Sequence, residues 1–249
     1  MSGRVAVVTG GVGGIGTAIC QSMAKAGFRV VATCAPFEAG KIAEEWAAAR
    51  KAEGFDMPVY AVEVSDFEQC KATVAKIQAE VGPVEVLVNN AGITKDGTLK
   101  KMSWDQWNAV LNVNLDSVFN MSRNVVDGML ERGFGRIVNI SSVNGQKGQF
   151  GQCNYSAAKA GMHGFTMALA QEVATKGITV NTVSPGYIGT QMVMAIEEEI
   201  RNKIIAQVPV RRLGKPEEIG RLVAFLAADE SGYITGSNIA INGGLFMSF

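Results

Sequence analysis

The sequence predicts a single α/β domain in which a parallel sheet of seven strands is flanked by helices on both faces. Two observations lead to this fold class. Short runs rich in Val and Ile alternate with longer segments whose apolar residues recur at helical spacing. Several of these runs are apolar almost throughout, as is typical of strands buried on both faces of a parallel sheet. With 249 residues, 47% of them hydrophobic, the chain can form one such domain over residues 1–249.

The expected strands and helices alternate along most of the chain, as in a doubly wound sheet. The strands are expected at 4–10, 29–34, 59–64, 84–90, 136–141, 178–184 and 238–243. The helices are expected at 14–26, 39–53, 66–81, 103–131, 154–176 and 215–228. An additional amphipathic stretch at 190–210 follows the sixth strand.

The charge and cysteine content argue against several classes of function. Lysine plus arginine (23) balances aspartate plus glutamate (23), so neither nucleic acid nor an anionic membrane surface is expected as the main partner. Four cysteines at irregular spacing and a single histidine indicate neither a disulfide framework nor a metal site. No apolar run approaches the ~18 residues that a membrane helix needs. We therefore expect a soluble, cytoplasmic protein without a metal.

A glycine-rich turn, TGGVGGIG at 9–16, follows the first expected strand and opens the first helix. Glycines permit a tight turn and let the backbone approach a pyrophosphate, while the helix offers its N-terminal N–H groups. This is the context that a dinucleotide-binding motif requires, so the sequence predicts a Rossmann fold that binds NADH or NADPH. The turn residues expected to hold the cofactor are Gly10, Gly13, Gly14, Ile15 and Gly16.

The residues after the second expected strand bear on the choice between NADH and NADPH. An acidic residue there accepts from the ribose 2′-hydroxyl of NAD, whereas a basic residue pairs with the 2′-phosphate of NADP. Ala35 follows the strand and is neutral, Glu38 lies three residues further on, and the loop contains no arginine. A carboxylate repels a 2′-phosphate, so the sequence favours NADH. The alternative is that Glu38 only begins a solvated helix.

Three side chains are spaced as a proton-transfer site for carbonyl reduction. Tyr155 and Lys159 are four residues apart at the start of a helix of small residues and therefore lie on one face. A nearby ammonium lowers the phenol pKa from its usual value of about 10. Ser142 follows the fifth strand, where it can hydrogen-bond a substrate carbonyl from the other side. We expect Ser142 to polarise the carbonyl, Tyr155 to donate the proton and a nicotinamide to supply the hydride.

Five motifs occur in an order that resembles the short-chain dehydrogenase/reductase family. They are TGGVGGIG, NNAG at 89–92, NVNL with Asn114, the set Ser142, Tyr155 and Lys159, and SPG at 184–186. The resemblance spans essentially the whole chain. It implies that Asn114 completes a catalytic tetrad through a helix carbonyl and a water relay to Lys159. It also implies a homotetramer and a lid over the substrate formed by 190–210.

The same resemblance implies further contacts with the cofactor. Family members bind adenine beside an Asp-Val or Asn-Val pair after the third strand, and this chain has Glu63-Val64 there. The departure leaves the Glu63 side-chain contact open but not the backbone contact of Val64. The remaining implied cofactor residues are Asn90, Ala91, Gly92, Tyr155, Lys159, Pro185, Gly186, Ile188 and Thr190.

The stretch SSVNGQKGQFGQCNYS at 141–156 resembles that of a group within this family, the acetoacetyl-CoA reductases of polyhydroxyalkanoate synthesis. The resemblance implies reduction of acetoacetyl-CoA to (R)-3-hydroxybutyryl-CoA. Glutamine amides suit this substrate because a β-keto thioester has a second carbonyl to hold. The alternative is that the glutamines decorate a flexible loop. The implied substrate residues are Asp96, Ser142, Gln149, Phe150, Gln152, Tyr155 and Tyr187.

Other functions remain open at this point. A 3-oxoacyl-acyl-carrier-protein reductase uses the same tetrad, and basic residues beside the cleft would favour its acidic partner. The lysines at 95, 100 and 101 could meet coenzyme A phosphates, but an ordinary solvated cluster explains them better. A sugar or polyol dehydrogenase would run the same chemistry in reverse. A non-catalytic redox sensor would keep the glycine turn and lose the tyrosine or lysine. The single histidine, His163, is expected to be a packed or interface residue.

Overall fold

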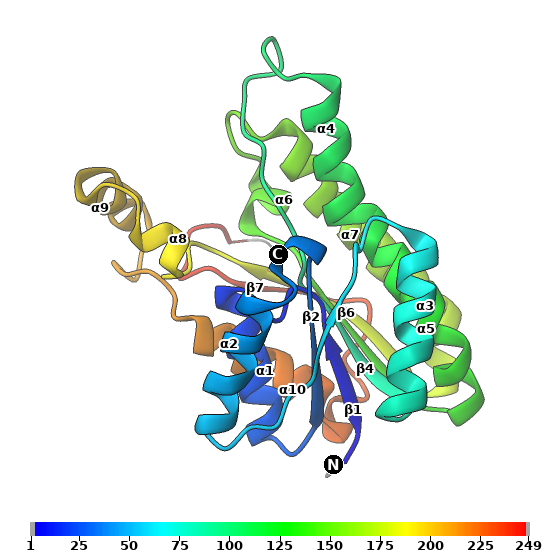
Figure 1. Ribbon diagram of the computed structural model, residues 1–249. Coiled ribbons are helices and arrows are strands. Elements are labelled where there is room, and N and C mark those ends of the chain that lie inside the picture. The colour runs from blue at the N-terminus through cyan, green and yellow to red at the C-terminus, as the bar shows by residue number, and fades with distance from the viewer. Residues whose placement is uncertain (1–2, 248–249) are drawn as a thin grey trace.

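The computed structural model describes residues 3–247, and its seven strands form one sheet in the order β3-β2-β1-β4-β5-β6-β7 (Figure 1). Every neighbouring pair is parallel, which confirms the expected fold class. Residues 1–2 and 248–249 of the expected domain lie outside the described residues. The strands are β1 (Val5–Val8), β2 (Arg29–Cys34), β3 (Val59–Ala61), β4 (Val84–Asn89), β5 (Gly135–Ile140), β6 (Ile178–Pro185) and β7 (Asn238–Ile241).

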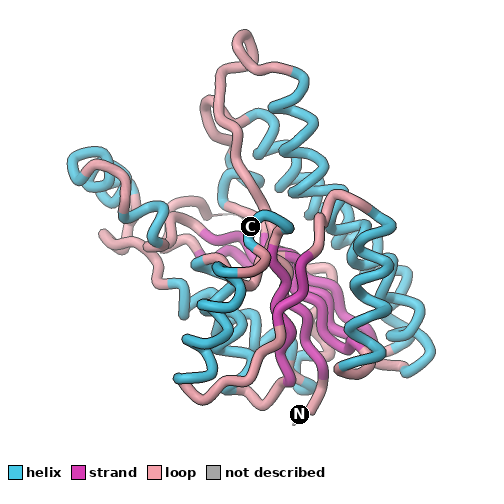
Figure 2. The backbone as a smooth tube through the Cα atoms, in the orientation of Figure 1, coloured by secondary structure: helices cyan, strands magenta, loops and turns pink. Residues whose placement is uncertain are grey.

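Helices cover both faces of the sheet, as Figure 2 shows with the strands between them. One face carries α1 (Gly14–Lys25), α2 (Lys41–Ala52) and α10 (Pro216–Ala227). The other face carries α3 (Phe67–Glu80), α5 (Ser117–Arg132) and α7 (Cys153–Val173), with α4 (Trp104–Leu111) packed on α7. Within residues 3–247, no helix combines the length and hydrophobicity needed to span a bilayer.

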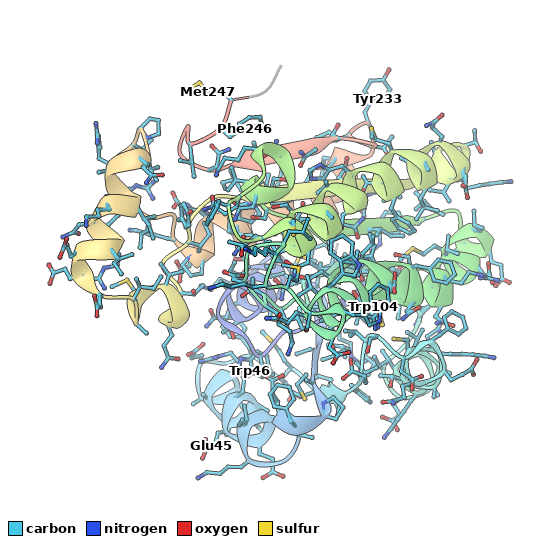
Figure 3. All side chains as sticks on the ribbon, turned by 90° about the horizontal axis from the view of Figure 1, so that it is seen from above. Glu45, Trp46, Trp104, Tyr233, Phe246 and Met247 are labelled. Carbon is cyan, nitrogen blue, oxygen red and sulfur yellow. The ribbon has the colours of Figure 1, made fainter. Side chains whose placement is uncertain are left out.

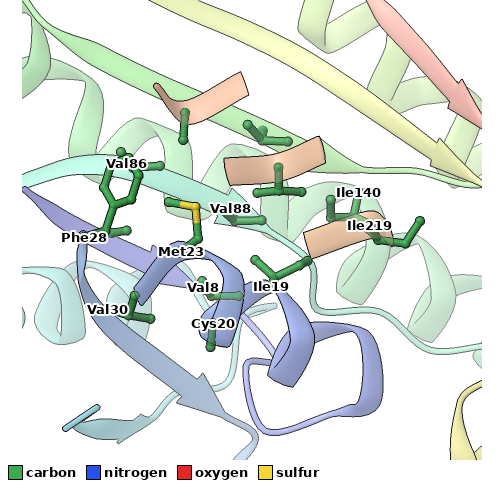
Figure 4. Packing of buried hydrophobic residues seen from close by; sticks show 14 of the residues in the cluster. Val8, Ile19, Cys20, Met23, Phe28, Val30, Val86, Val88, Ile140 and Ile219 are labelled. Carbon is green, nitrogen blue, oxygen red and sulfur yellow. The ribbon is translucent and has the colours of Figure 1, made fainter. Parts of the chain in front are cut away.

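Apolar side chains from the two faces of the sheet form two separate core clusters. Val7 and Val8 are adjacent in β1, yet each belongs to a different cluster, as expected for a strand buried on both faces. In the cluster drawn in Figure 4, Ile19 and Met23 of α1 pack together with Ile219 of α10 against the sheet. Burial of this apolar surface supplies the main driving force for folding.

The order of the strands fixes the position of the binding crevice. The chain winds in one direction from β1 to β3 and in the other from β4 to β7, so connections diverge between β1 and β4. Ligands of open α/β sheets bind outside the carboxyl ends of the strands at such a point. The segments after β1, β4, β5 and β6 therefore form the candidate site.

Helix α2 is anchored to α1 by a tryptophan, which holds the β2–α2 connection near the crevice. Trp46, labelled in Figure 3, is buried, and its Nε1–H donates to Thr17 Oγ1 at 2.8 Å. The Arg50 guanidinium lies 5.6 Å from the same ring. The hydrogen bond therefore joins α1, which follows the glycine turn, to α2, which follows the loop at 35–40.

The expected helix at 103–131 is confirmed as one helical segment from Trp104 to Arg132, but a π-helical turn at 112–116 lies between its two α-helical parts, α4 and α5. The Asn114 side chain causes the local difference: its Nδ2 donates to Val110 O and to Ile93 O, at 2.9 and 2.8 Å. Single π turns of this kind occur often at functional sites. Two smaller differences are that β3 is shorter than expected and that a short helix, α6 (Val143–Lys147), lies within the expected loop.

The expected lid at 190–210 consists of two short helices, α8 (Gln191–Met194) and α9 (Glu198–Gln207). Both project away from the sheet in Figure 1. The two ends of this segment meet at its base, where Gly189 N donates to Gly214 O at 2.8 Å and Gly214 N donates to Tyr187 O at 2.9 Å. The segment is therefore an insertion whose two ends lie next to each other on the domain.

The close crossing of α1 and α10 generates a prediction about stability. A Cβ at Gly220 would overlap the Ala18 carbonyl and Ser22 Oγ, so Gly220→Ala is expected to destabilise the fold by about 1–3 kcal/mol despite the better helix propensity of Ala. At Gly164 in α7 nothing lies within 4 Å of the added atom, so Gly164→Ala should stabilise by up to ~1 kcal/mol. The melting temperatures of both variants, measured by thermal unfolding, check this. Equal changes of melting temperature in the two variants would contradict the close packing of α1 against α10 at Gly220.

Candidate active site

The glycine turn connects β1 to the N-terminus of α1 without any side chain to cap the helix. Gly13 is the N-cap residue, and no side chain accepts from the first-turn N–H groups. Gly16 has to be glycine, because a Cβ there would overlap the Gly10 carbonyl oxygen. Gly13 and Gly14 are exposed, so the free N–H groups and the positive end of the helix dipole face the crevice.

The turn after β4 is hydrogen-bonded directly to the glycine turn. Thr9 Oγ1 accepts from the backbone N–H groups of Asn90 and Ala91, at 2.9 and 3.0 Å. The side chain of Asn90 also donates, from its Nδ2, to Thr9 O at 2.9 Å and to Gly10 O at 3.1 Å. The residues 90–92 expected to line the cofactor are therefore held at one edge of the same crevice.

The segment after β6 closes the other side of the glycine turn. Thr190 lies over Gly14, where an added Cβ would come within 3.1 Å of it. Gly186 N donates to Ile241 O at 3.0 Å, which fixes the start of this segment on β7. Pro185 ends β6, and the Ile188 side chain is packed into the core. An uncapped helix N-terminus enclosed by exposed glycines and a threonine fits a pyrophosphate.

The residues expected to bind the adenosine half lie at the ends of β2 and β3. Glu38 folds back so that its Oε2 accepts from Ala35 N at 2.9 Å, which keeps a carboxylate at the end of β2. Glu63 Oε1 accepts from Ser65 Oγ at 2.7 Å, and Val64 O accepts from Asn120 Nδ2 at 3.0 Å. The Glu63 carboxylate is thus engaged with its own loop.

Ser142, Tyr155 and Lys159 come together after β5 and on the first turns of α7. Ser142 is the N-cap residue of α6, where its Oγ accepts from Asn144 N at 3.1 Å. The same hydroxyl is close enough to the Tyr155 phenol to affect its pKa, and the Lys159 Nζ lies 5.5 Å from the Tyr155 ring. Lys159 is 3% exposed, and its Nζ donates to Ile140 O at 2.8 Å. The structure therefore brings the expected proton-transfer residues together.

Burial moves the pKa values of this cluster in opposite directions. Desolvation raises the pKa of the Tyr155 phenol, and the nearby Ser142 hydroxyl lowers it in part. Desolvation alone lowers the pKa of the Lys159 ammonium to about 7. Tyr155 is therefore protonated and able to donate at neutral pH. The expected lowering of the phenol pKa is therefore wrong, because desolvation is its largest cause and raises it.

Asn114 lies beside Lys159 with part of its hydrogen-bonding capacity unused. Its Nδ2 is fully engaged with the Ile93 and Val110 carbonyls, while no described residue donates to its buried Oδ1. Gly92 separates the two side chains, because a Cβ there would lie 2.5 Å from Asn114 Oδ1 and 3.4 Å from Lys159 Nζ. The contact of Asn114 with Ile93 could not be read from spacing, since it depends on the π turn.

The expected substrate residues lie on two loops that are joined to each other. Gln152 Nε2 donates to Asp96 Oδ2 at 2.8 Å, and Gln152 Oε1 accepts from Asn144 Nδ2 at 2.9 Å. Gln149 Oε1 accepts from Lys147 Nζ at 2.9 Å. Asn144 was not predicted, although it stands in the quoted loop beside the glutamines. The loop is therefore organised by hydrogen bonds.

Two aromatic side chains border this loop from different directions. Phe150 is 87% exposed at the tip of the loop, and Tyr187 is partly buried at the base of the lid. Burial raises the pKa of Tyr187, which stays a neutral phenol. The lysines at 95, 100 and 101 are exposed on the neighbouring loop. Among residues 3–247, no three His, Cys, Asp or Glu side chains gather as a metal site requires.

Comparison with known proteins agrees with this arrangement. The family model described as enoyl-(acyl carrier protein) reductase matches residues 10–246. A protein of Allochromatium vinosum named acetoacetyl-CoA reductase is 63% identical, over 98% of this chain and 99% of its own length. One of the same name from Cupriavidus necator is 59% identical over 99% and 100%. The 3-oxoacyl-[acyl-carrier-protein] reductase FabG of Vibrio harveyi is 43% identical over 99% of both.

The matching family model and these relatives span nearly the whole chain. The chain belongs to the short-chain dehydrogenase/reductase family.

Proposed function

We propose that this chain reduces acetoacetyl-CoA to (R)-3-hydroxybutyryl-CoA with a nicotinamide cofactor, in the cytoplasm, and so feeds polyhydroxybutyrate synthesis. The observation that carries the proposal is the cluster of Ser142, Tyr155 and buried Lys159 beside a loop fixed through Gln152 and Asp96. The relatives of Allochromatium vinosum and Cupriavidus necator carry the corresponding name at 63% and 59% identity.

Each member of the cluster has a role that follows from its position. The nicotinamide, when bound, supplies the hydride. Ser142 donates to the substrate carbonyl and polarises it, and Tyr155 gives its proton to the oxygen. Lys159 in its ammonium form stabilises the phenolate that is left. Asn114, which is held in place by the Ile93 carbonyl, is the fourth member of the tetrad.

The acyl group is proposed to lie along the loop after β5. Gln149 and Gln152 supply amide groups for the thioester carbonyl, and the exposed ring of Phe150 covers the short acyl chain. Asp96 keeps Gln152 in place, and Tyr187 borders the pocket from the lid side. A loop held by hydrogen bonds loses less conformational entropy when the substrate binds.

A second candidate is the reduction of a 3-oxoacyl group carried by acyl carrier protein. The exposed lysines at 95, 100 and 101 would suit an acidic carrier, and the Vibrio harveyi relative bears that name at 43% identity. The higher identity to the acetoacetyl-CoA reductases favours the CoA ester.

We further propose a homotetramer in which α5 and α7 form an interface. A groove between these helices is lined largely by apolar side chains together with Arg123, Asp127 and Glu172. Apolar area with charges of both signs suits contact with the same surface of a second copy, as a two-fold interface requires.

Replacing the proton donor separates chemistry from cofactor binding. Tyr155→Phe is expected to lower the rate of acetoacetyl-CoA reduction by about 10²–10⁴, while NADH binding, followed by its fluorescence, persists. Tyr233→Phe is the matched control, because Tyr233 is fully exposed and lies far from the tetrad in sequence. Unchanged turnover in Tyr155→Phe would overturn the assignment of the donor.

The carboxylate at the end of β2 is expected to select NADH. Glu38→Gln keeps an acceptor for Ala35 N–H but removes the charge, whereas Glu38→Ala removes both. Both variants should lower the ratio of kcat/KM for NADH over NADPH, by about tenfold if the charge is worth ~1.4 kcal/mol. Initial rates with acetoacetyl-CoA measure the ratio. A fall in Glu38→Ala alone would mean that capping matters and charge does not, and an unchanged ratio in both would remove the argument for NADH.

A further inference from the structure

Polar side chains replace the usual Val and Ile where the sheet passes beneath α7. Asn89, Asn139 and Thr182 are aligned on β4, β5 and β6 by the strand register. Asn89 Nδ2 donates to Asn139 Oδ1 at 2.8 Å, and Asn139 Nδ2 donates to Thr166 Oγ1 of α7 at 2.9 Å. Thr166 and Thr182 are joined by their hydroxyls at 2.7 Å. We call these four residues the lower polar row.

A second row of polar side chains lies two residues nearer the active site, and we call it the upper polar row. Ser141 Oγ donates to the backbone carbonyl of Lys159 at 2.8 Å. His163 Nε2 lies 2.9 Å from Ser141 Oγ and 3.4 Å from Ser184 Oγ. Ser184 Oγ donates to Asn238 Oδ1 at 2.7 Å. The upper row thus joins β5, α7, β6 and β7.

The positions of the protons in the upper row determine the state of the histidine. The Ser141 hydroxyl proton goes to Lys159 O and the Ser184 proton to Asn238 Oδ1, so both oxygens present acceptors to the ring. His163 Nε2 must therefore carry a hydrogen. Burial lowers the pKa of His163, which favours a neutral ring with the hydrogen on Nε2.

We propose that Ser141 and His163 are positioning residues for proton transfer, a role that rests on the proposed function. Ser141 is bonded to the carbonyl of one tetrad residue, Lys159, and precedes another, Ser142, directly in the chain. His163 holds Ser141 and is one helical turn beyond Lys159. The upper row thereby fixes how far α7 extends over β5, and with it the spacing of Ser142, Tyr155 and Lys159.

Buried hydrogen bonds fix the position of α7 on the sheet more precisely than apolar packing does. Apolar packing between a helix and a sheet tolerates small shifts, whereas a buried hydrogen bond has one geometry and is costly to leave unmade. A misplacement of about 1 Å at a catalytic group costs ~10²-fold in rate. Loss of the upper row should therefore affect turnover more than stability.

The test compares two variants of the upper row with one of the lower row. His163→Leu is expected to lower kcat at least about tenfold, while His163→Gln, whose amide can donate to Ser141, restores most of it. Thr166→Val is the matched control, because it removes buried hydrogen bonds on the same helix seven residues beyond Lys159. It should lose similar stability in urea unfolding and keep kcat within about twofold, whereas equal losses of kcat in His163→Leu and Thr166→Val would overturn the proposal.

A second readout does not depend on the substrate. The Lys159 titration, followed by NMR of side-chain-labelled lysine with Lys159→Met to identify its signal, is expected near pH 7 in the wild type. In His163→Leu and Ser141→Ala it should move up toward the ordinary lysine value of about 10.4 as the ammonium gains water, and in Thr166→Val it should stay. An unmoved titration would overturn the proposal. If the wild type fails to reduce acetoacetyl-CoA, the proposed function is wrong, and this titration still decides the positioning role.

Discussion

The burial of the Lys159 ammonium is the constraint around which the rest of the site is arranged. The side chain is 3% exposed, and its Nζ donates to the Ile140 carbonyl. None of the ion pairs among residues 3–247 includes it. A charge in such a place costs stability, and desolvation accordingly lowers its pKa to about 7. A fold keeps a group of this kind when its position serves the chemistry.

The neighbouring features all bear on where this ammonium lies. The π turn places Asn114 beside it, and Gly92 leaves room between the two. The hydrogen bond from Ser141 to the Lys159 backbone holds α7 against β5, next to Ser142. The hydrogen bonds between Thr9 and Asn90 bring the cofactor turn to the same edge of the sheet. Stability of the scaffold and precision of the site therefore come from different contacts, apolar clusters for the first and buried polar rows for the second.

Much of the fold and of the tetrad could be predicted because the signals are local. The strand runs, the glycine turn and the spacing of Tyr155 and Lys159 each depend on residues close together in the chain. The π turn between α4 and α5 could not be predicted, because Asn114 bonds the Ile93 carbonyl across 21 residues. The link from His163 to Ser141 is likewise a contact between a helix and a strand. From sequence alone, a histidine there indicates no more than a packed residue.

The decisive measurement is the unfolding free energy of Lys159→Met and of the wild type in urea, from pH 6 to pH 10. It tests whether the buried ammonium of Lys159 destabilises the fold. The folded-state pKa of about 7 lies below the ordinary lysine value of 10.5, so wild-type stability should rise with pH between these values. We expect the variant to be the more stable protein at pH 6, because the buried charge costs the wild type up to about 5 kcal/mol while the hydrogen bond lost in the variant is worth only ~1 kcal/mol. The gap should shrink steadily from pH 7 to pH 10. A variant that is less stable at pH 6, or a gap that does not change with pH, would contradict the claim that Lys159 is a buried charge kept for function.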